Sequence, residues 1–200
     1  MNRVVRWVLG AGLAATIAGG AGAQGQSSES EAFLAAIREK DGAKADTIIG
    51  KQGPSVVNYR GYNGDTPLTV AMASRNTTYV NYLIGKGAQP DLPDKRGDTP
   101  LIIAARSGFS EGIVRMLAAK ANVNAANRQG ETALIVAVQQ RQTAIVKLLL
   151  AAGADADKAD FAAGYSARDY ARRDTRSREL SRMIETIKPA KKSVSGPIRF

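Results

Sequence analysis

Closely spaced carboxylates are the residues of this chain whose type and spacing could do chemistry. Asp155, Asp157 and Asp160 form one group, and Asp91 and Asp94 form a similar one upstream. Carboxylate oxygens at such spacing are typical of a calcium loop, but an EF-hand-type loop also needs glycine at its sixth position and glutamate at its twelfth. Counted from Asp155, those positions hold Asp160 and Ser166. Because short polar side chains also stabilise tight turns, we predict turns here and no metal site.

The composition removes most other catalytic chemistry. The chain has no cysteine and no histidine. Disulfides, thiol nucleophiles, Cys or His metal sites and proton relays built on imidazole are therefore excluded. No glycine-rich phosphate loop or nucleophile motif occurs, and no two carboxylates have the surroundings that paired acid–base catalysis requires. We predict a protein that is not an enzyme and needs no cofactor.

A repeat organises the chain. The stretch GDTPLIIAARSG, from Gly97 to Gly108, has copies that begin at Gly64, Gly130 and Gly164, so the opening glycines lie 33, 33 and 34 residues apart. Self-similarity at this period indicates an array of small supersecondary units. Each unit is too small to bury its own apolar face and is completed by its neighbours.

A second apolar stretch follows the first three copies: YVNYLIGKGAQPD (79–91), GIVRMLAAKANVN (112–124) and AIVKLLLAAGADAD (144–157). The period and the Thr-Pro-Leu signature together resemble ankyrin repeats. The resemblance is strong over residues 60–188 and weak over 29–58. It implies an all-α ankyrin repeat solenoid of helix-turn-helix units, with about five repeats including degenerate caps.

The repeats also predict helix ends. Thr66, Thr99, Thr132 and Ser166 stand where a hydroxyl can cap the first helix, and Pro67 and Pro100 suit its first turn. Gly87 and Gly153 follow the second helix, at the position where a residue with left-handed backbone usually ends a helix. The middle repeat has Lys120 at this position. The histidine that ankyrin repeats usually carry after the leucine is replaced by Thr69, Ile102, Ile135 and Arg168. Other groups must therefore make its hydrogen bonds, or the bonds are missing.

The two ends of the chain differ from the repeats. Residues 1–23 resemble a cleaved signal peptide, with Arg3 and Arg6 before a short apolar run and Ala21-Gly22-Ala23 as cleavage pattern. We expect a disordered lead-in over 24–28, a degenerate N-terminal capping repeat over 29–58 and an ankyrin repeat domain over 59–188. Residues 189–200 should form a flexible basic tail. The arginines of the last repeat, from Arg168 to Arg182, should form the polar face of a C-terminal cap.

The resemblance implies that a concave face made of turn tips and first helices binds proteins. Mapped onto this sequence, that face is basic and polar with a tyrosine toward each end: Arg60, Tyr62, Lys95, Arg96, Arg106, Arg128, Gln129, Gln139, Tyr165 and Arg173. Tyrosine and arginine often anchor interfaces, so the target would be an acidic protein surface. The same charges could equally be a solvated surface on a basic protein, partly neutralised by Asp98 and Glu131.

The most specific prediction is a non-catalytic protein–protein interaction module in a bacterial envelope. The chain has a formal charge of +10, but export to the periplasm or beyond argues against nucleic acid as its partner. We expect a monomer. Neutralisation of a toxin, assistance to a secreted enzyme and scaffolding are not separated by the residues. An alternative is a binder of anionic lipid or polysaccharide that uses the basic C-terminal cap and tail at a membrane surface. An enzyme without a recognisable motif is a third class.

Overall fold

A computed structural model describes residues 21–186, with side chains described from residue 28. This part of the chain contains ten α-helices, one 3-10 helix and no β-strand. In order they are α1 (Ala21–Glu39), α2 (Gly42–Gln52), η1 (Pro54–Asn58), α3 (Pro67–Ala73), α4 (Thr77–Gly85), α5 (Pro100–Arg106), α6 (Ser110–Ala118), α7 (Ala133–Gln139), α8 (Thr143–Ala151), α9 (Ala167–Arg173) and α10 (Arg178–Glu185).

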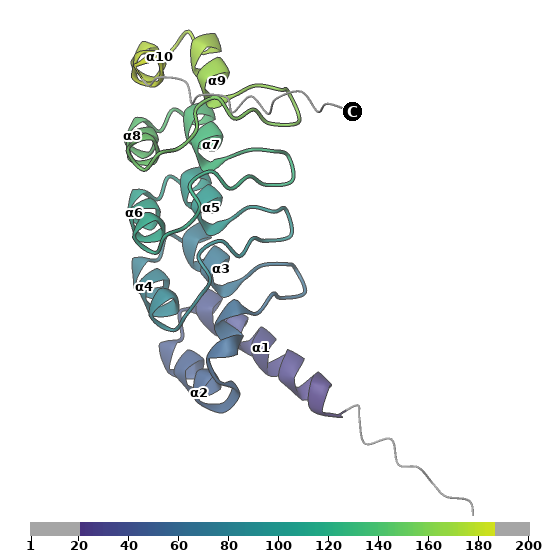
Figure 1. The fold of residues 1–200 in the computed structure, drawn as a ribbon. Helices are drawn as coiled ribbons and strands as arrows, with labels where there is room; N and C mark the ends of the chain where they lie inside the picture. Colours follow the sequence, from purple (N-terminus) through teal and green to yellow (C-terminus); the bar gives the residue numbers. More distant parts are fainter. Residues whose placement is uncertain (1–20, 187–200) are drawn as a thin grey trace, which may run out of the picture.

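The helices stack in two columns (Figure 1). The odd-numbered helices pack on one another from α1 through α3, α5 and α7 to α9, and α4, α6, α8 and α10 pack likewise in the second column. Between consecutive pairs, a long loop projects sideways as a finger, and the stack bows so that fingers and odd-numbered helices line its concave side (Figure 1). The expected all-α solenoid with five helix pairs, caps included, is confirmed.

The predicted helix starts are confirmed as well. The side chains of Thr66, Thr99, Thr132 and Ser166 each accept a hydrogen bond from the backbone amide three residues on. Each bond satisfies a donor that a helix start would otherwise leave without a partner. Pro67 and Pro100 occupy the first turn, where a missing N–H costs nothing. The capping residues thus fix where every first helix of a full repeat begins.

One apolar core runs through the whole stack. The leucine two residues after the capping threonine is buried in α3, α5 and α7. The next residue, at the expected histidine position, is buried as well: Thr69, Ile102 and Ile135. Arg168, at the same position of the last repeat, is only 7 % exposed. Its guanidinium pairs with Asp157 at 2.7 Å and donates to the carbonyl of Ile184 at 2.7 Å. The expectation that Arg168 belongs to the solvated face of the cap is therefore wrong.

The N-terminal segment also differs from expectation. Residues 24–28 belong to α1, whereas we predicted a disordered lead-in. Helix propagation adds one hydrogen bond per residue once a turn exists, and Phe33, Leu34 and Ile37 bury the C-terminal half of α1 in the core. The expected cleavage position after Ala23 lies within this helix. Residues 1–20 and the tail expected at 189–200 lie outside the described residues.

Several turns require left-handed backbone. Lys120 has a φ of 63°, as its place after the second helix predicted. Lys40, Arg75 and Arg141 share this conformation and follow α1, α3 and α7. These three were not predicted, because none of them is glycine or asparagine. A non-glycine residue in this region costs about 1–2 kcal/mol.

The opening glycines of the repeats let the fingers stack closely. A Cβ built on Gly97 would lie 2.9 Å from the amide nitrogen of Arg128 in the next finger, and one on Gly130 would lie 2.8 Å from that of Phe161. Hydrogen bonds join the same fingers, from the Arg128 amide to the Arg96 carbonyl and from the Phe161 amide to the Gln129 carbonyl. Gly164 opens the last finger, and among the described residues no heavy atom lies within 4 Å of its Cβ position. This close approach explains why the repeat begins with glycine.

Candidate functional site

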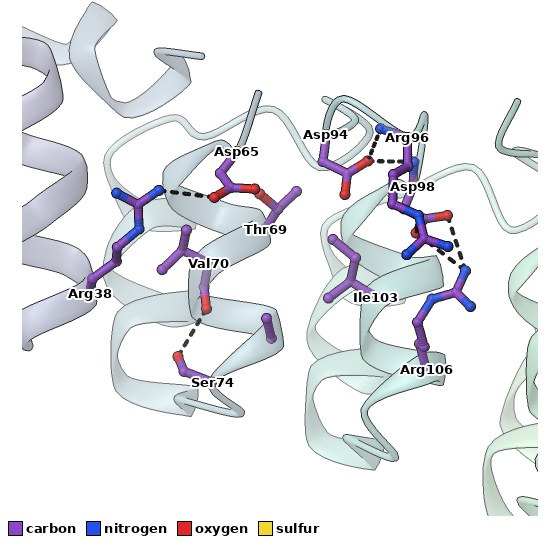
Figure 2. A pocket seen from close by; sticks show the side chains of 11 residues that line it. Arg38, Asp65, Thr69, Val70, Ser74, Asp94, Arg96, Asp98, Ile103 and Arg106 are labelled. Carbon is purple, nitrogen blue, oxygen red and sulfur yellow. Dashed lines mark hydrogen bonds and ion pairs between the residues drawn. The ribbon is translucent and has the colours of Figure 1, made fainter. Parts of the chain in front are cut away.

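An open groove of about 500 Å³ lies on the concave side, between α3 and α5 (Figure 2). Residues of α1, α3, α5 and two fingers line it: Arg38, Asp65, Thr69, Val70, Ala73, Ser74, Asp94, Arg96, Asp98, Ile103 and Arg106. Ser74 donates its hydroxyl proton to the carbonyl of Val70 at 2.9 Å, so this polar group is satisfied within α3. Val70, Ala73 and Ile103 add apolar surface. The groove can therefore accept an apolar side chain between charged rims.

Most charged side chains at the two ends of the groove form ion pairs. At one end Arg38 from α1 reaches Asp65 at 2.9 Å, and at the other Arg106 from α5 reaches Asp98 at 3.2 Å (Figure 2). Asp94 accepts hydrogen bonds from the backbone amides of Arg96 and Asp98, which closes its finger. The acidic groups of the groove thus have partners within the protein.

Arg106 belongs to a network that crosses two repeats. Asp98 is 2 % exposed and also accepts from the side-chain amide of Asn127 at 2.7 Å. The same amide donates to Glu131 at 2.9 Å, and Arg106 approaches Glu131 at 3.4 Å. The Arg106 Nε is buried without a hydrogen-bond partner among the described residues. Because its guanidinium holds two fingers together, Arg106 shapes the groove, and its side chain is only 32 % exposed.

Most of the other sequence-predicted site residues are exposed, as their mapping requires: Arg60, Tyr62, Lys95, Arg96, Arg128, Gln129, Gln139 and Arg173. In the described part of the chain, Arg60, Lys95 and Arg128 have no carboxylate within ion-pair distance. Arg96 approaches Asp98 at 3.7 Å, with its side chain 55 % exposed. Of the predicted residues, the groove brings together Arg96 and Arg106. Gln139 and Arg173 line a separate hollow between α7 and α9.

Tyr165 is less available than the sequence suggested. Its ring meets Tyr170 edge-on at 5.6 Å between centroids, and the Arg173 guanidinium lies 4.5 Å from the Tyr165 ring centre. The exposed aromatic residue of this finger is Phe161, at 79 %, which matches Tyr62 of the first finger at 77 %. Sequence reasoning missed Phe161. The available signal was the repeat period, since Phe161 follows Arg128 by 33 residues, as Arg128 follows Lys95.

The carboxylates considered as calcium ligands serve the turns and the cap. Asp155 accepts the amide of Asp157, and Asp157 pairs with Arg168. Asp160 accepts the amides of Ala163 and Gly164 and the hydroxyl of Tyr170 at 2.6 Å. Burial raises the pKa of Asp160, but these hydrogen bonds outweigh it and hold the pKa below the usual range. Asp160 therefore stays ionised as an acceptor for its own finger.

Comparison with known protein families agrees with this geometry. A family model described as ankyrin repeats (3 copies) matches residues 17–125 and 70–160. The chain belongs to the ankyrin repeat family. Ankyrin repeats are protein–protein interaction modules, and a search of curated proteins found no match to this chain. Within residues 21–186, no helix combines the length and apolar character needed to cross a bilayer.

This ankyrin chain joins its repeats without the usual histidine. Asn58 donates to the carbonyl of Gly87 at 3.1 Å and accepts the amide of Gln89 at 2.7 Å. Two repeats later, Asn124 donates to the carbonyl of Gly153 and accepts the amide of Asp155 at 2.7 Å. Asparagine, which carries both a donor and an acceptor, thus bridges the turns that follow neighbouring second helices.

Proposed function

We propose that this protein binds an extended acidic segment of a protein partner across its fingers, with one apolar side chain of that segment in the groove between α3 and α5. The observation that carries the proposal is an asymmetry of charge on the concave side. The acidic groups there have partners within the protein, whereas the basic groups at the finger tips point to solvent.

The basic residues form a row along consecutive fingers. Arg60 precedes Gly64, Lys95 and Arg96 precede Gly97, and Arg128 precedes Gly130, and all four basic side chains are exposed. Stacking of the fingers through these glycines keeps the bases at regular intervals. A row of one sign attracts an oppositely charged segment and speeds encounter. Arginine adds bidentate hydrogen bonds to carboxylates, which favours Asp and Glu side chains over isolated charges.

The groove supplies the apolar part of the contact. Its volume of about 500 Å³ exceeds that of any single side chain, and Val70, Ala73 and Ile103 offer apolar surface between satisfied ion pairs. Burial of an apolar side chain there contributes roughly 1.5–3 kcal/mol. Tyr62 in the first finger and Phe161 in the last add exposed aromatic rings at the two ends of the row of fingers, and such rings commonly anchor interfaces.

Selection from a random peptide library displayed on phage tests this proposal without a known partner. We expect the wild-type protein to enrich peptides that carry several Asp or Glu residues and one apolar residue. The variant Lys95→Glu with Arg128→Glu should lose this enrichment, and Ile103→Glu should lose the preference for the apolar residue. A matched control reverses two exposed charges on the second helix column, Arg115→Glu with Lys147→Glu.

Two outcomes contradict the proposal. One is a selected pool without acidic bias. The other is enrichment that the finger variant retains and the control loses. Circular dichroism establishes that each variant is folded. Substitutions at the exposed charged positions should change stability little, whereas Ile103 is partly buried, so Ile103→Glu is compared only once its fold is shown to be intact. Arg106 is left unchanged, because glutamate there would face Asp98 and Glu131 and break the network between repeats.

We also propose that the protein works after export into a bacterial envelope, as a monomer and without a cofactor. Support for export comes from the sequence alone, namely the basic start, the short apolar run and the small residues before Gln24. N-terminal sequencing of the protein recovered from cell fractions tests the location. A chain that begins after Ala23 in the periplasm or medium supports it, and an intact chain in the cytoplasm contradicts it. Light scattering measures the oligomeric state.

A further inference from the structure

Figure 1 shows α9 and α10 at the C-terminal end of the stack. Residues of these helices and of the turn between them line another charged hollow, of about 310 Å³. Its lining contains three guanidinium groups, two hydroxyls and one carboxylate, from Arg172, Arg178, Arg182, Thr175, Ser181 and Asp174. It lies at the opposite end of the array from the groove between α3 and α5, so its function is independent of the proposed partner binding.

The carboxylates around this hollow are already occupied. Asp174 accepts hydrogen bonds from the guanidinium of Arg141, which follows α7, and from the backbone amide of Arg176 at 3.0 Å. The Arg141 and Arg176 hydrogen bonds hold the pKa of Asp174 below its usual range. Glu179 faces Lys147 at 3.5 Å, and Glu185 faces Arg172 at 3.7 Å. Asp174 and Glu179 therefore neutralise bases outside the hollow, whereas Glu185 partly neutralises Arg172, which lines it.

Arg178 and Arg182 form no ion pair in the described part of the chain. Glu179 follows Arg178 directly, but among the described residues no carboxylate lies within ion-pair distance of either guanidinium. Both are exposed and lie four residues apart on α10, which places them on one face of the helix. Burial of Leu180 and Ile184 in the core fixes the rotation of α10 and keeps this face outward. Like charges at this spacing repel one another, and a bound anion would relieve that repulsion.

We propose that the hollow binds a phosphate monoester dianion. Three guanidinium groups around one small space match a ligand that carries two charges and several oxygens, because each guanidinium can donate two parallel hydrogen bonds. Ser181 donates its hydroxyl proton to the Ala171 carbonyl at 2.6 Å, so Thr175 is the hydroxyl available to the ligand. The monoester is either a soluble metabolite-sized ligand or the headgroup of phosphatidic acid, since both present the same group.

Titration of the whole chain with glycerol 3-phosphate, followed by NMR, tests the site. We expect amide shifts concentrated between Thr175 and Arg182. Arg178→Gln and Arg182→Gln should each weaken binding about tenfold, as expected when one charge-assisted contact is lost. Arg182→Lys should retain part of the affinity because the charge remains. The matched control is Arg115→Gln, which removes an exposed arginine from α6 and should change affinity less than about twofold.

Vesicles separate the two sources of the ligand. Phosphatidylcholine vesicles with phosphatidic acid present the monoester, and vesicles with phosphatidylglycerol present a diester of lower charge. If the protein binds glycerol 3-phosphate and Arg182→Gln weakens this binding, the site takes a soluble ligand. If the protein binds only phosphatidic acid vesicles and Arg182→Gln weakens that binding, the site takes a lipid headgroup. Equal binding to both vesicles, or equal losses in Arg182→Gln and Arg115→Gln, overturns the proposal, because the arginines then act as diffuse charge.

Discussion

Replacement of the finger glycines by alanine separates the effect of backbone conformation from that of finger stacking. Gly97 and Gly164 both have a left-handed φ, of 81° and 69°. A Cβ on Gly97 would meet the next finger at 2.9 Å, whereas a Cβ on Gly164 would meet no atom of the described residues within 4 Å. Gly97→Ala therefore adds strain and a clash, and Gly164→Ala adds strain alone. Both variants change the unfolded chain in the same way, so that contribution cancels between them.

The magnitudes follow from these two contributions. Alanine in the left-handed region destabilises the folded state by about 1–2 kcal/mol. Alanine also lowers the conformational entropy of the unfolded chain, which offsets about 0.4–1 kcal/mol of this loss. Overpacking against a neighbouring backbone costs a further 1–3 kcal/mol or so. We expect Gly164→Ala to lower the free energy of unfolding by about 0.5–1.5 kcal/mol and Gly97→Ala by about 2–4 kcal/mol. Gly130→Ala should resemble Gly97→Ala, because its Cβ would lie 2.8 Å from the Phe161 amide.

Urea denaturation followed by circular dichroism measures the difference, with thermal melting as a second probe. A difference of 1–3 kcal/mol corresponds to roughly 3–10 °C in melting temperature for a chain of this size. Repeat arrays can unfold in more than one step, so the transitions must coincide between probes before free energies are compared. Equal losses for Gly97→Ala and Gly164→Ala would refute the argument, since the fingers would then have room for a methyl group.

Three further predictions concern the ends of helices and the last repeat. Lys120→Gly should stabilise the protein by roughly 0.5–1 kcal/mol, because relief of left-handed strain exceeds the added unfolded-state entropy; an unchanged or lower melting temperature contradicts this. Arg168→Leu should cost about 2–4 kcal/mol, since it leaves the Ile184 carbonyl without its donor and Asp157 without its cation, and hydrogen exchange should show α10 opening first. The pKa of Asp160 is lowered in the folded protein, so its contribution to stability is present above about pH 3.9 and is lost as the pH falls below that value. Asp160→Asn should make acid unfolding less steep in that range, and no change in the slope would count against the role of this carboxylate.

Local signals made most of the fold predictable. The hydroxyl before each first helix, the proline after it and the left-handed residue after each second helix act within a few residues, so one sequence suffices to locate them. Thr99 and Lys120 show this, since both adopt the predicted conformation. Arg75 and Arg141 were not foreseen as left-handed, because the intrinsic preference of arginine opposes the conformation that the backbone hydrogen bonds at these helix ends require.

The site was less predictable because its properties depend on partners from other repeats. Arg106 was assigned to the exposed basic face, with Asp98 and Glu131 expected at most to neutralise that face in part. In the structure these two carboxylates fix the Arg106 guanidinium. Phe161 and Tyr165 lie in one finger, and the sequence alone did not show which ring would be exposed. Tyr170 and Arg173 cover Tyr165, and neither is adjacent to it in the chain. Burial of a side chain in a solenoid is therefore decided by the neighbouring helix pair.

The same packing explains how charge is distributed on the concave side. Aspartates at finger turns accept backbone amides of their own loop, as Asp94 does, or face the next repeat, as Asp98 does. Arginine and lysine have longer side chains and no acceptor, so they cannot close a turn in this way. Repetition of such turns places the acidic groups inside and the basic groups at the tips. A basic row along the fingers is thus a consequence of how the turns are built, and its use in binding depends on whether a partner presents carboxylates at the spacing of consecutive fingers.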